Sequence, residues 1–337
     1  MTSILFRDII RQSWQIMLRF KYLWLFGFFA ALLGAGGELQ VLVSNVLFVG
    51  DSPETLIGIQ GLFNTGLLGV LFTNFKDFLA GSTLEAILFL LVFIVGAVMA
   101  IWLIITSQGA LYDGVSRILK GKKVNTAQGY KAGAAFFGRI LSLNIISAIV
   151  IYGLLTIISL PIILVLLLKS TQTGILLFVL FSFLILILFA LPIIFIVKFA
   201  TLHVVVHNHS LWQSLSAGWN LFKRNVLATL EMAIVIFFLS IASTLALLIV
   251  LAFLSVPFIL LGMLAIIFDM QFALSIVIVL GFIVIGIAGI MYGALFSTFR
   301  YSAWTLFFHR LISDKGSSKI LRVFGHAADY FGKKPSK

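Results

Sequence analysis

Cysteine is absent from the sequence, and proline and charged residues are scarce. Without cysteine, disulfide bonds, thiolate metal sites, iron–sulfur clusters and thiol nucleophiles are all excluded. Charged residues make up 10% of the 337 residues, whereas about a quarter is usual in a soluble domain. Hydrophobic residues make up 62% of the sequence, and the mean hydropathy is +1.20. This composition predicts an all-α membrane protein with several spans and no ordinary soluble domain.

Acidic residues are also few, because 11 Asp and Glu stand against 23 Lys and Arg, which gives a formal net charge of +12. In a soluble domain such an excess favours a nucleic-acid partner. In this chain the basic residues lie between apolar segments, where anionic lipid headgroups are the nearer partner. We therefore expect contact with anionic membrane lipids and no binding of nucleic acid.

Catalytic motifs are missing as well. The sequence has no nucleophile elbow, no H-E-x-x-H metal motif and no pair of acids spaced for acid–base work. The glycine-rich stretch from Gly34 to Gly37 lacks the Lys-Ser or Lys-Thr that completes a phosphate-binding loop. These absences predict no enzymatic activity, no catalytic residue and no cofactor.

Long apolar segments are what the sequence does contain, and they predict six membrane spans. Crossing the hydrocarbon core takes about 20 apolar residues, and residues 86–105 form an uninterrupted apolar run of that length. The other spans are expected at residues 22–38, with a possible continuation to 48, and at 140–160, 175–197, 226–253 and 272–295. Pro161 is expected to end or kink the third span, and Asp269 marks the turn before the last.

The segment before the first span and the segment between the first two spans are the least regular parts of this pattern. A basic amphipathic segment precedes residue 22, so the first span is interpreted as uncleaved and not as a secretory signal. Residues 50–85 mix Gly, Asn and Asp with apolar residues. We interpret them as a loop that dips into the membrane interface.

Basic residues fall on one side of this layout. All Lys and Arg residues except Lys76 and Lys169 lie on the side that holds both termini. The opposite side instead carries carboxylates, at Glu38, Asp51, Glu54, Asp77, Glu85 and Asp269. The positive-inside rule then predicts a multi-pass protein of the cytoplasmic membrane with both termini in the cytoplasm.

Three amphipathic helices are expected at the basic side of the membrane. Residues 4–21 and 210–224 place apolar and charged residues on different faces of a helix. In the second of these, the predicted apolar face holds Trp212, Trp219 and Phe222, the predicted polar face holds Ser214, and Ser210 caps the first turn. Residues 125–139 form the third such segment, with Asn125 as its cap.

These helices indicate an internal repeat. Asn125 to Arg139 and Ser210 to Arg224 have the same length, and the spans that follow them contain Ser159-Leu160-Pro161 and Ser255-Val256-Pro257. Trp14 precedes Arg19 by the same five positions that separate Trp219 from Arg224. We expect three repeats of an interfacial helix plus a membrane hairpin, at about 1–120, 121–207 and 208–315, within a six-span domain of residues 1–315. Residues 316–337 form a basic cytoplasmic tail.

Short motifs give the chain a resemblance to a known group. They are Lys21-Tyr22-Leu23-Trp24-Leu25-Phe26, Gly121-Lys122-Lys123, and Ser214-Leu215-Ser216-Ala217-Gly218-Trp219 before Arg224-Asn225. With the six-span pattern, these motifs resemble the membrane domain of some glycerophosphodiester phosphodiesterases and the YciC-like inner-membrane proteins. In the phosphodiesterases a separate soluble barrel carries the catalysis, so the resemblance implies no activity here.

Glu231 is the one carboxylate expected inside a span. A charge in hydrocarbon costs a few kcal/mol or more, so it should face protein, water or a cation. Lys198, near the end of the fourth span, is its expected partner, and the two form either a proton or ion site or a helix-packing pair. Asn144, Gln108 and Tyr152 are expected to hydrogen-bond between helices, and Gly286, Gly289 and Gly293 to form a close-packing face.

A histidine cluster follows the fourth span. His203, His207 and His209 have an H-x3-H-x-H spacing, and two histidines four apart on a helix can hold a metal. No carboxylate or thiol stands nearby to complete the shell, and structural interfacial histidines are more common. We therefore expect no metal site.

A non-catalytic role in organising or binding anionic lipid, or a partner membrane protein, fits these features best. The headgroup contacts are expected from Arg11, Arg19, Lys122, Lys123, Arg139, Lys223 and Arg224. The anchors at the interface are expected to be Trp14, Trp212 and Trp219. The alternative is a transporter or permease with a cavity near Asn144, Lys198 and Glu231.

Overall fold

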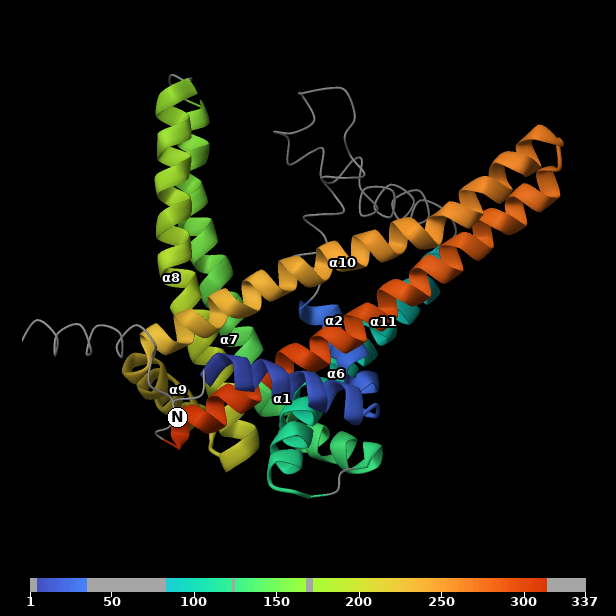
Figure 1. The fold of residues 1–337 in the computed structure, drawn as a ribbon. Helices are drawn as coiled ribbons and strands as arrows, with labels where there is room; N and C mark the ends of the chain where they lie inside the picture. Colours follow the sequence, from blue (N-terminus) through green and yellow to red (C-terminus); the bar gives the residue numbers. More distant parts are fainter. Residues whose placement is uncertain (1–4, 35–82, 123–124, 168–171, 314–337) are drawn as a thin grey trace, which may run out of the picture. The chain divides into compact units, whose positions relative to one another are not determined.

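The computed structural model describes residues 5–34, 83–122, 125–167 and 172–313. These residues form eight helices and no strand (Figure 1). The helices are α1 (Leu5–Arg19), α2 (Leu23–Gly34), α6 (Thr83–Leu119), α7 (Thr126–Leu167), α8 (Gln172–His207), α9 (Leu211–Arg224), α10 (Val226–Ile267) and α11 (Gln271–Ile312). The expected all-α fold is confirmed.

Five of these helices, α6, α7, α8, α10 and α11, are long and apolar enough to cross a membrane. The pair α1 and α2, bent by 110° at a short break, passes the same test only when taken together and would give a sixth if it forms one span. The described part of the chain is therefore that of a helical protein consistent with several membrane passes. The interpretation of residues 50–85 as an interfacial loop falls almost entirely outside the described residues.

The chain divides into two compact units. One comprises Leu33–Ile104, of which the structure describes the beginning of α6. From Ile87 to Ile104 the side chains of α6 are apolar and largely exposed, which is the pattern of a helix that faces lipid. The other unit comprises Met1–Leu32 and Ile105–Lys337 and contains the features considered below.

Two antiparallel helix pairs make up much of the larger unit. Helix α7 packs along α8, and α10 packs along α11 (Figure 1). The turn between α10 and α11 is made by Phe268, Asp269 and Met270, and Asp269 takes a left-handed φ of 51°. A short polar residue tolerates that conformation well, so Asp269 closes the hairpin as expected.

Several helices are longer than the predicted spans. Helices α6 and α8 run beyond Ile105 and Val197 to Leu119 and His207. Helix α10 continues through Pro257, and the bounds of α7 include Pro161. Of the two alternatives predicted for Pro161, an end of the helix is therefore wrong, and a kink stays a prediction. In apolar surroundings the remaining backbone groups gain more from a continued helix than from an exposed break, so proline is tolerated there.

The hydrophobic core lies at the helix ends that carry the basic residues, not in the middle of the spans. We call it the basic-end core. Phe199 of α8 stacks against Phe308 of α11 and meets Phe307 at a tilt, each at 6.4 Å between ring centroids. Tyr112 of α6 meets Tyr301 of α11 at 4.9 Å. The extensions of α6, α8 and α11 therefore pack together, and the amphipathic helices cover them.

Candidate functional site

Helix α1 is fixed to the basic-end core through one face. Phe6, Ile9 and Met17 are buried on that face, and the ring of Phe6 meets that of Phe307 of α11 at a tilt, with the ring centroids 6.4 Å apart. Arg11 and Arg19 are exposed on the other side. The predicted division between apolar and basic faces of this helix is confirmed.

Trp14 lies at the edge of that buried face. Its side chain keeps 54% of its surface exposed while it meets the ring of Phe299 edge-on at 6.1 Å. A half-covered indole beside exposed arginines is the arrangement expected for an interfacial anchor. Its contact with lipid remains a prediction.

A sharp corner sets the direction of α1 relative to α2. Between them stand Phe20, Lys21 and Tyr22. The indole N–H of Trp24 donates a hydrogen bond of 2.7 Å to the carbonyl of Met17 and so ties the two helices together across the bend. The corner turns α2 by 110° away from the direction of α1.

Helix α2 packs closely on α11 at a glycine. A side chain at Gly27 would collide with the carbonyl of Ala294 and the hydroxyl of Thr298. Thr298 also donates hydrogen bonds to the carbonyls of Ala294 at 2.7 Å and Leu23 at 3.2 Å. The sequence did not indicate this contact.

The glycine face predicted on α11 is largely wrong. A methyl group added at Gly286 or Gly289 would meet nothing within 4 Å, and one at Gly293 would only touch Ala31 at 3.5 Å. Spacing at helical intervals therefore does not identify a close helix contact by itself.

Helix α9 begins directly after Ser210, as predicted. The side-chain oxygen of Gln213 accepts a hydrogen bond of 3.2 Å from the backbone N–H of Ser210. The buried face differs from the expected one, because Ser214, Gly218 and Phe222 face the core while Trp212 is 73% and Trp219 is 49% exposed.

The close approach of α9 to α8 explains which face is buried. A Cβ atom at Gly218 would stand 2.7 Å from the carbonyl oxygen of Ile196 and 2.9 Å from the backbone nitrogen of Ala200. Two helices approach so closely only where the residue between them is small. A large apolar residue such as Trp219 therefore does not occupy this close contact, and the predicted placement of Ser214 on the polar face is wrong.

The middle amphipathic segment differs from the other two in its connection. No break separates residues 126–139 from the span that follows, so both belong to the continuous helix α7. Its docking is nevertheless similar, because a side chain at Gly133 would collide with the carbonyl of Thr106 in α6. Asn125 stands directly before α7, at the predicted cap position, but its side chain accepts a hydrogen bond of 2.7 Å from the N–H of the adjacent Thr126 and not from the second or third helical residue that a cap usually binds.

The three amphipathic segments have a small buried residue and an arginine at the same spacing. Each has a small buried residue six positions before an arginine, as in Ser13 and Arg19, Gly133 and Arg139, and Gly218 and Arg224. The segments pack on α11, α6 and α8, respectively. This spacing was visible in the sequence, but hydropathy does not identify small residues as contact residues.

The predicted headgroup cations do not all have the same surroundings. Lys122, Lys223 and Arg224 are exposed, and Lys123 lies outside the described residues. Arg139 is half-buried, and its Nη1 donates to the carbonyls of Asn208 at 3.3 Å and His209 at 3.0 Å. This arginine therefore holds the connection between α8 and α9 through part of its guanidinium group.

The polar residues expected inside the spans have partners from several helices. Asn144 donates hydrogen bonds to the side chain of Gln108 at 3.2 Å and to the carbonyl of Ile140 at 3.1 Å. The predicted hydrogen bond between helices is confirmed for Asn144 and Gln108. Tyr152 is exposed.

Lys198 lies beside an aromatic residue that the sequence did not pair with it. Its ammonium group stands 4.0 Å from the ring centroid of Trp304 and 6.0 Å from that of Phe195. Such a contact stabilises a half-buried cation by about 0.5–2 kcal/mol. Glu231 is half-buried, and its role as a proton or ion site remains a prediction.

The histidine rings lie close together but do not converge. Ring centroids of His203, His207 and His209 are 5.2–5.6 Å apart, and the rings of His203 and His209 are nearly parallel at 4°. Within the described part of the chain, no group of three or more His, Cys, Asp or Glu side chains is arranged to hold a metal ion. His203 is buried against Phe308, and neither of its ring nitrogens has a hydrogen-bond partner among the residues that the structure describes.

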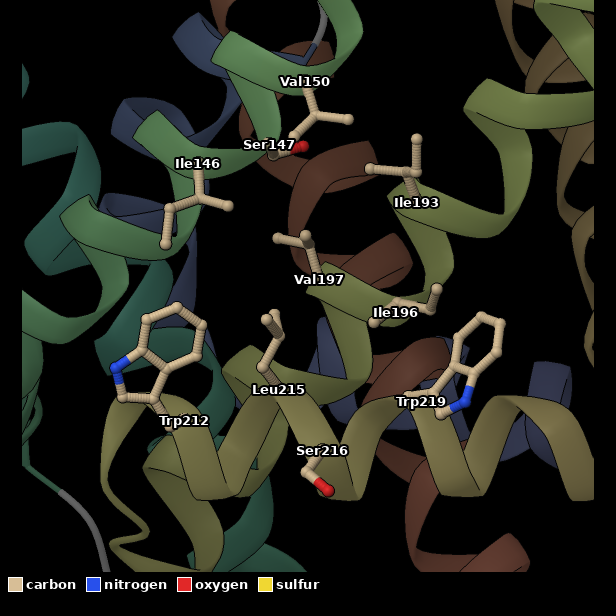
Figure 2. A pocket seen from close by; sticks show the side chains of 10 residues that line it. All are labelled: Ile146, Ser147, Val150, Ile193, Ile196, Val197, Trp212, Leu215, Ser216 and Trp219. Carbon is tan, nitrogen blue, oxygen red and sulfur yellow. The ribbon is translucent and has the colours of Figure 1, made fainter.

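An apolar groove lies between α7, α8 and α9 (Figure 2). We call it the α9 groove. Its volume is about 440 Å³. Its lining residues are Ile146, Ser147, Val150, Ile193, Ile196, Val197, Trp212, Leu215, Ser216 and Trp219.

A second groove, of about 400 Å³, lies between α10 and α11. Its lining includes Ile259, Gly262 and Ile278. Neither groove is lined by Asn144 or Glu231. A transport cavity near these residues remains a prediction.

Comparison of the chain with protein-family models, with curated proteins and with solved structures finds no match. The resemblance to phosphodiesterase membrane domains and YciC-like proteins therefore remains a prediction, and the residues themselves must carry any proposal about function.

Proposed function

We propose that this protein is a non-catalytic protein of the cytoplasmic membrane that holds anionic lipid headgroups at its basic side. In this proposal both termini are cytoplasmic, and the three amphipathic segments lie in the inner interface of the bilayer. The protein would organise lipid around itself, and no reaction or cofactor is involved.

One observation carries the proposal: exposed basic residues stand on helices that a packed core holds in place. Arg11 and Arg19 are presented by α1, and Lys223 and Arg224 by α9, while the opposite faces of both helices are buried. Cations held in a fixed arrangement lose little freedom when they bind a headgroup, so binding is stronger than for mobile side chains. Each basic residue near an anionic membrane contributes about 1 kcal/mol.

The exposed tryptophans support the same orientation. Trp14 and Trp219 are each about half exposed although the faces beside them are buried. Indole rings favour the headgroup level of a bilayer, where the ring meets apolar groups and the N–H meets polar ones. In this proposal the indole rings and the neighbouring arginines lie at one depth of the bilayer.

Native mass spectrometry of the protein purified from mixed phosphatidylglycerol and phosphatidylcholine bilayers tests the proposal. We expect phosphatidylglycerol to be retained preferentially. Neutralising Lys122, Lys223 and Arg224 to Gln should reduce that preference at least tenfold, because roughly 1 kcal/mol is lost per charge. As a matched control, Lys169→Gln removes a basic residue predicted on the opposite side and should change nothing.

Two results would contradict the proposal. The first is equal retention of both lipids by the unaltered protein. The second is an unchanged preference after the three neutralisations. Retention of an acidic membrane protein in place of lipid would instead support the partner-binding form of the prediction.

A further inference from the structure

The groove-facing side of α9 ends in a cation. Trp212, Ser216 and Trp219 line the α9 groove at spacings of four and three residues. Lys223 follows after four more and is exposed. Residues three and four apart stand on one face of a helix. The groove-facing residues of α9 are therefore followed, on the same face of the helix, by a basic residue about one helical turn beyond Trp219.

The walls of the groove are apolar. Val150 on α7 and Ile193 on α8 belong to helices long and apolar enough to cross a membrane. Figure 2 shows the indole rings of Trp212 and Trp219 standing on either side of Leu215 beneath these walls. The polar side-chain groups that line the groove are the small hydroxyls of Ser147 and Ser216 and the indole N–H groups. Such a space suits a hydrocarbon chain and offers no set of donors for a polar molecule.

We propose that the α9 groove binds one acyl chain of an anionic phospholipid whose phosphate lies against Lys223. This proposal rests on the proposed function and assigns one site to it. The groove supplies the apolar contact, the lysine supplies the charge, and the Trp219 N–H is a donor at the level of the glycerol esters. Arg224 stands next to Lys223 and is also exposed, so the phosphate meets a doubly positive helix end.

The helix end itself favours cations over anions, because the carboxyl end of a helix carries partial negative charge. The phosphate is thus bound by the Lys223 and Arg224 side chains and not by backbone groups of α9. Neutral phospholipid fills the apolar groove equally well but gains no net charge attraction at Lys223. Selectivity for an anionic headgroup should therefore depend on the lysine, and occupancy by any phospholipid should depend on the groove.

The test compares three variants by native mass spectrometry in mixed phosphatidylglycerol and phosphatidylcholine. Val150→Trp puts a large ring into the α9 groove at an exposed position. Ile278→Trp makes the same change at an exposed position of the groove between α10 and α11. Lys223→Gln removes the charge. We expect Val150→Trp to lower retention of the most tightly held lipid about tenfold, Lys223→Gln to lower the phosphatidylglycerol preference about fivefold, and Ile278→Trp to do neither.

A second measurement detects the acyl chain in the unblocked groove. Phosphatidylglycerol with brominated acyl chains quenches tryptophans that touch those chains. Quenching of the unaltered protein should exceed that of a variant in which Trp212 and Trp219 are both Phe, while loss of Trp14 should change it less. Equal quenching in the two proteins would refute the groove site.

The outcomes separate the site from the function. A phosphatidylglycerol preference that survives Val150→Trp and Lys223→Gln unchanged refutes this site and leaves the proposed function standing. Absence of any preference in the unaltered protein refutes both. Retention of a second copy of the chain, lost in Val150→Trp, refutes the lipid site by giving the groove another occupant.

Discussion

Replacing Gly218 by alanine tests whether α9 is held as closely to α8 as the structure shows. A methyl group at this position would stand 2.7 Å from the carbonyl oxygen of Ile196 and 2.9 Å from the nitrogen of Ala200. Both atoms belong to the backbone, so no side chain can rotate away and the helices must move apart. Overpacking of this kind costs about 1–3 kcal/mol.

An opposing effect has to be subtracted. In the interior of a helix, alanine is favoured over glycine by about 1 kcal/mol. The net result for Gly218→Ala should therefore lie between about zero and a destabilisation of 2 kcal/mol. Gly138→Ala in α7 is the matched control, because an added methyl group there meets nothing within 4 Å. It should be stabilising by about 0.4–1 kcal/mol.

The assay is thermal unfolding in detergent, followed by far-ultraviolet circular dichroism. A difference of 1 kcal/mol corresponds to roughly 2–4 °C at 150–250 residues and to somewhat less in a longer chain. Gly138→Ala should therefore raise the melting temperature slightly, whereas Gly218→Ala should leave it unchanged or lower it. Gly133→Ala should behave like Gly218→Ala, because its side chain would collide with the carbonyl of Thr106. If Gly218→Ala and Gly138→Ala raise the melting temperature equally, the close contact is wrong and with it the fixed presentation of Lys223.

Three further changes test other parts of the structure. Single cysteines can be introduced without background, because the chain has none. Cysteines that replace Lys122 and Ser336 should react with an impermeant maleimide from one side of the membrane, and a cysteine that replaces Lys169 should react from the other side. Labelling of the first two positions from opposite sides would contradict the even number of spans. His203→Phe should keep or raise the melting temperature, because a buried ring whose nitrogens lack hydrogen-bond partners within the described residues gains nothing from its polarity. A decrease of the free energy of unfolding by more than about 1 kcal/mol would indicate an unrecognised partner. Trp24→Phe should cost about 1 kcal/mol by removing the hydrogen bond across the corner between α1 and α2, and an unchanged melting temperature would argue against that bond.

The docked amphipathic segments explain how a protein with exposed spans keeps a defined structure. The side chains from Ile87 to Ile104 contribute little to the core, whereas the extensions of α6, α8 and α11 are mostly buried. Between apolar helices in lipid there is no hydrophobic driving force, so exact packing and hydrogen bonds decide association. In the proposed membrane placement the basic ends lie outside the hydrocarbon, where burial of Phe199 and Phe307 is again favoured by the hydrophobic effect.

Hydropathy and charge determined the coarse architecture. Long apolar runs can satisfy their backbone groups in lipid only as helices, so the all-α fold followed from composition. The start of α9 after Ser210, the turn at Asp269 and the two faces of α1 followed from local signals that depend on neighbouring residues alone. The bond between Asn144 and Gln108 followed from the cost of burying an unpaired amide.

Tertiary structure decided which apolar face meets protein and which is left for lipid. Periodicity identifies apolar positions on α9 but treats lipid and protein as the same environment, so it grouped Trp219 with Phe222. In the folded chain the small residue Gly218 faces α8 because only a small residue permits the close approach, and Trp219 turns to the groove. The aromatic partner of Lys198 depends likewise on α11, which lies far away in sequence and reaches it only after the helices have packed.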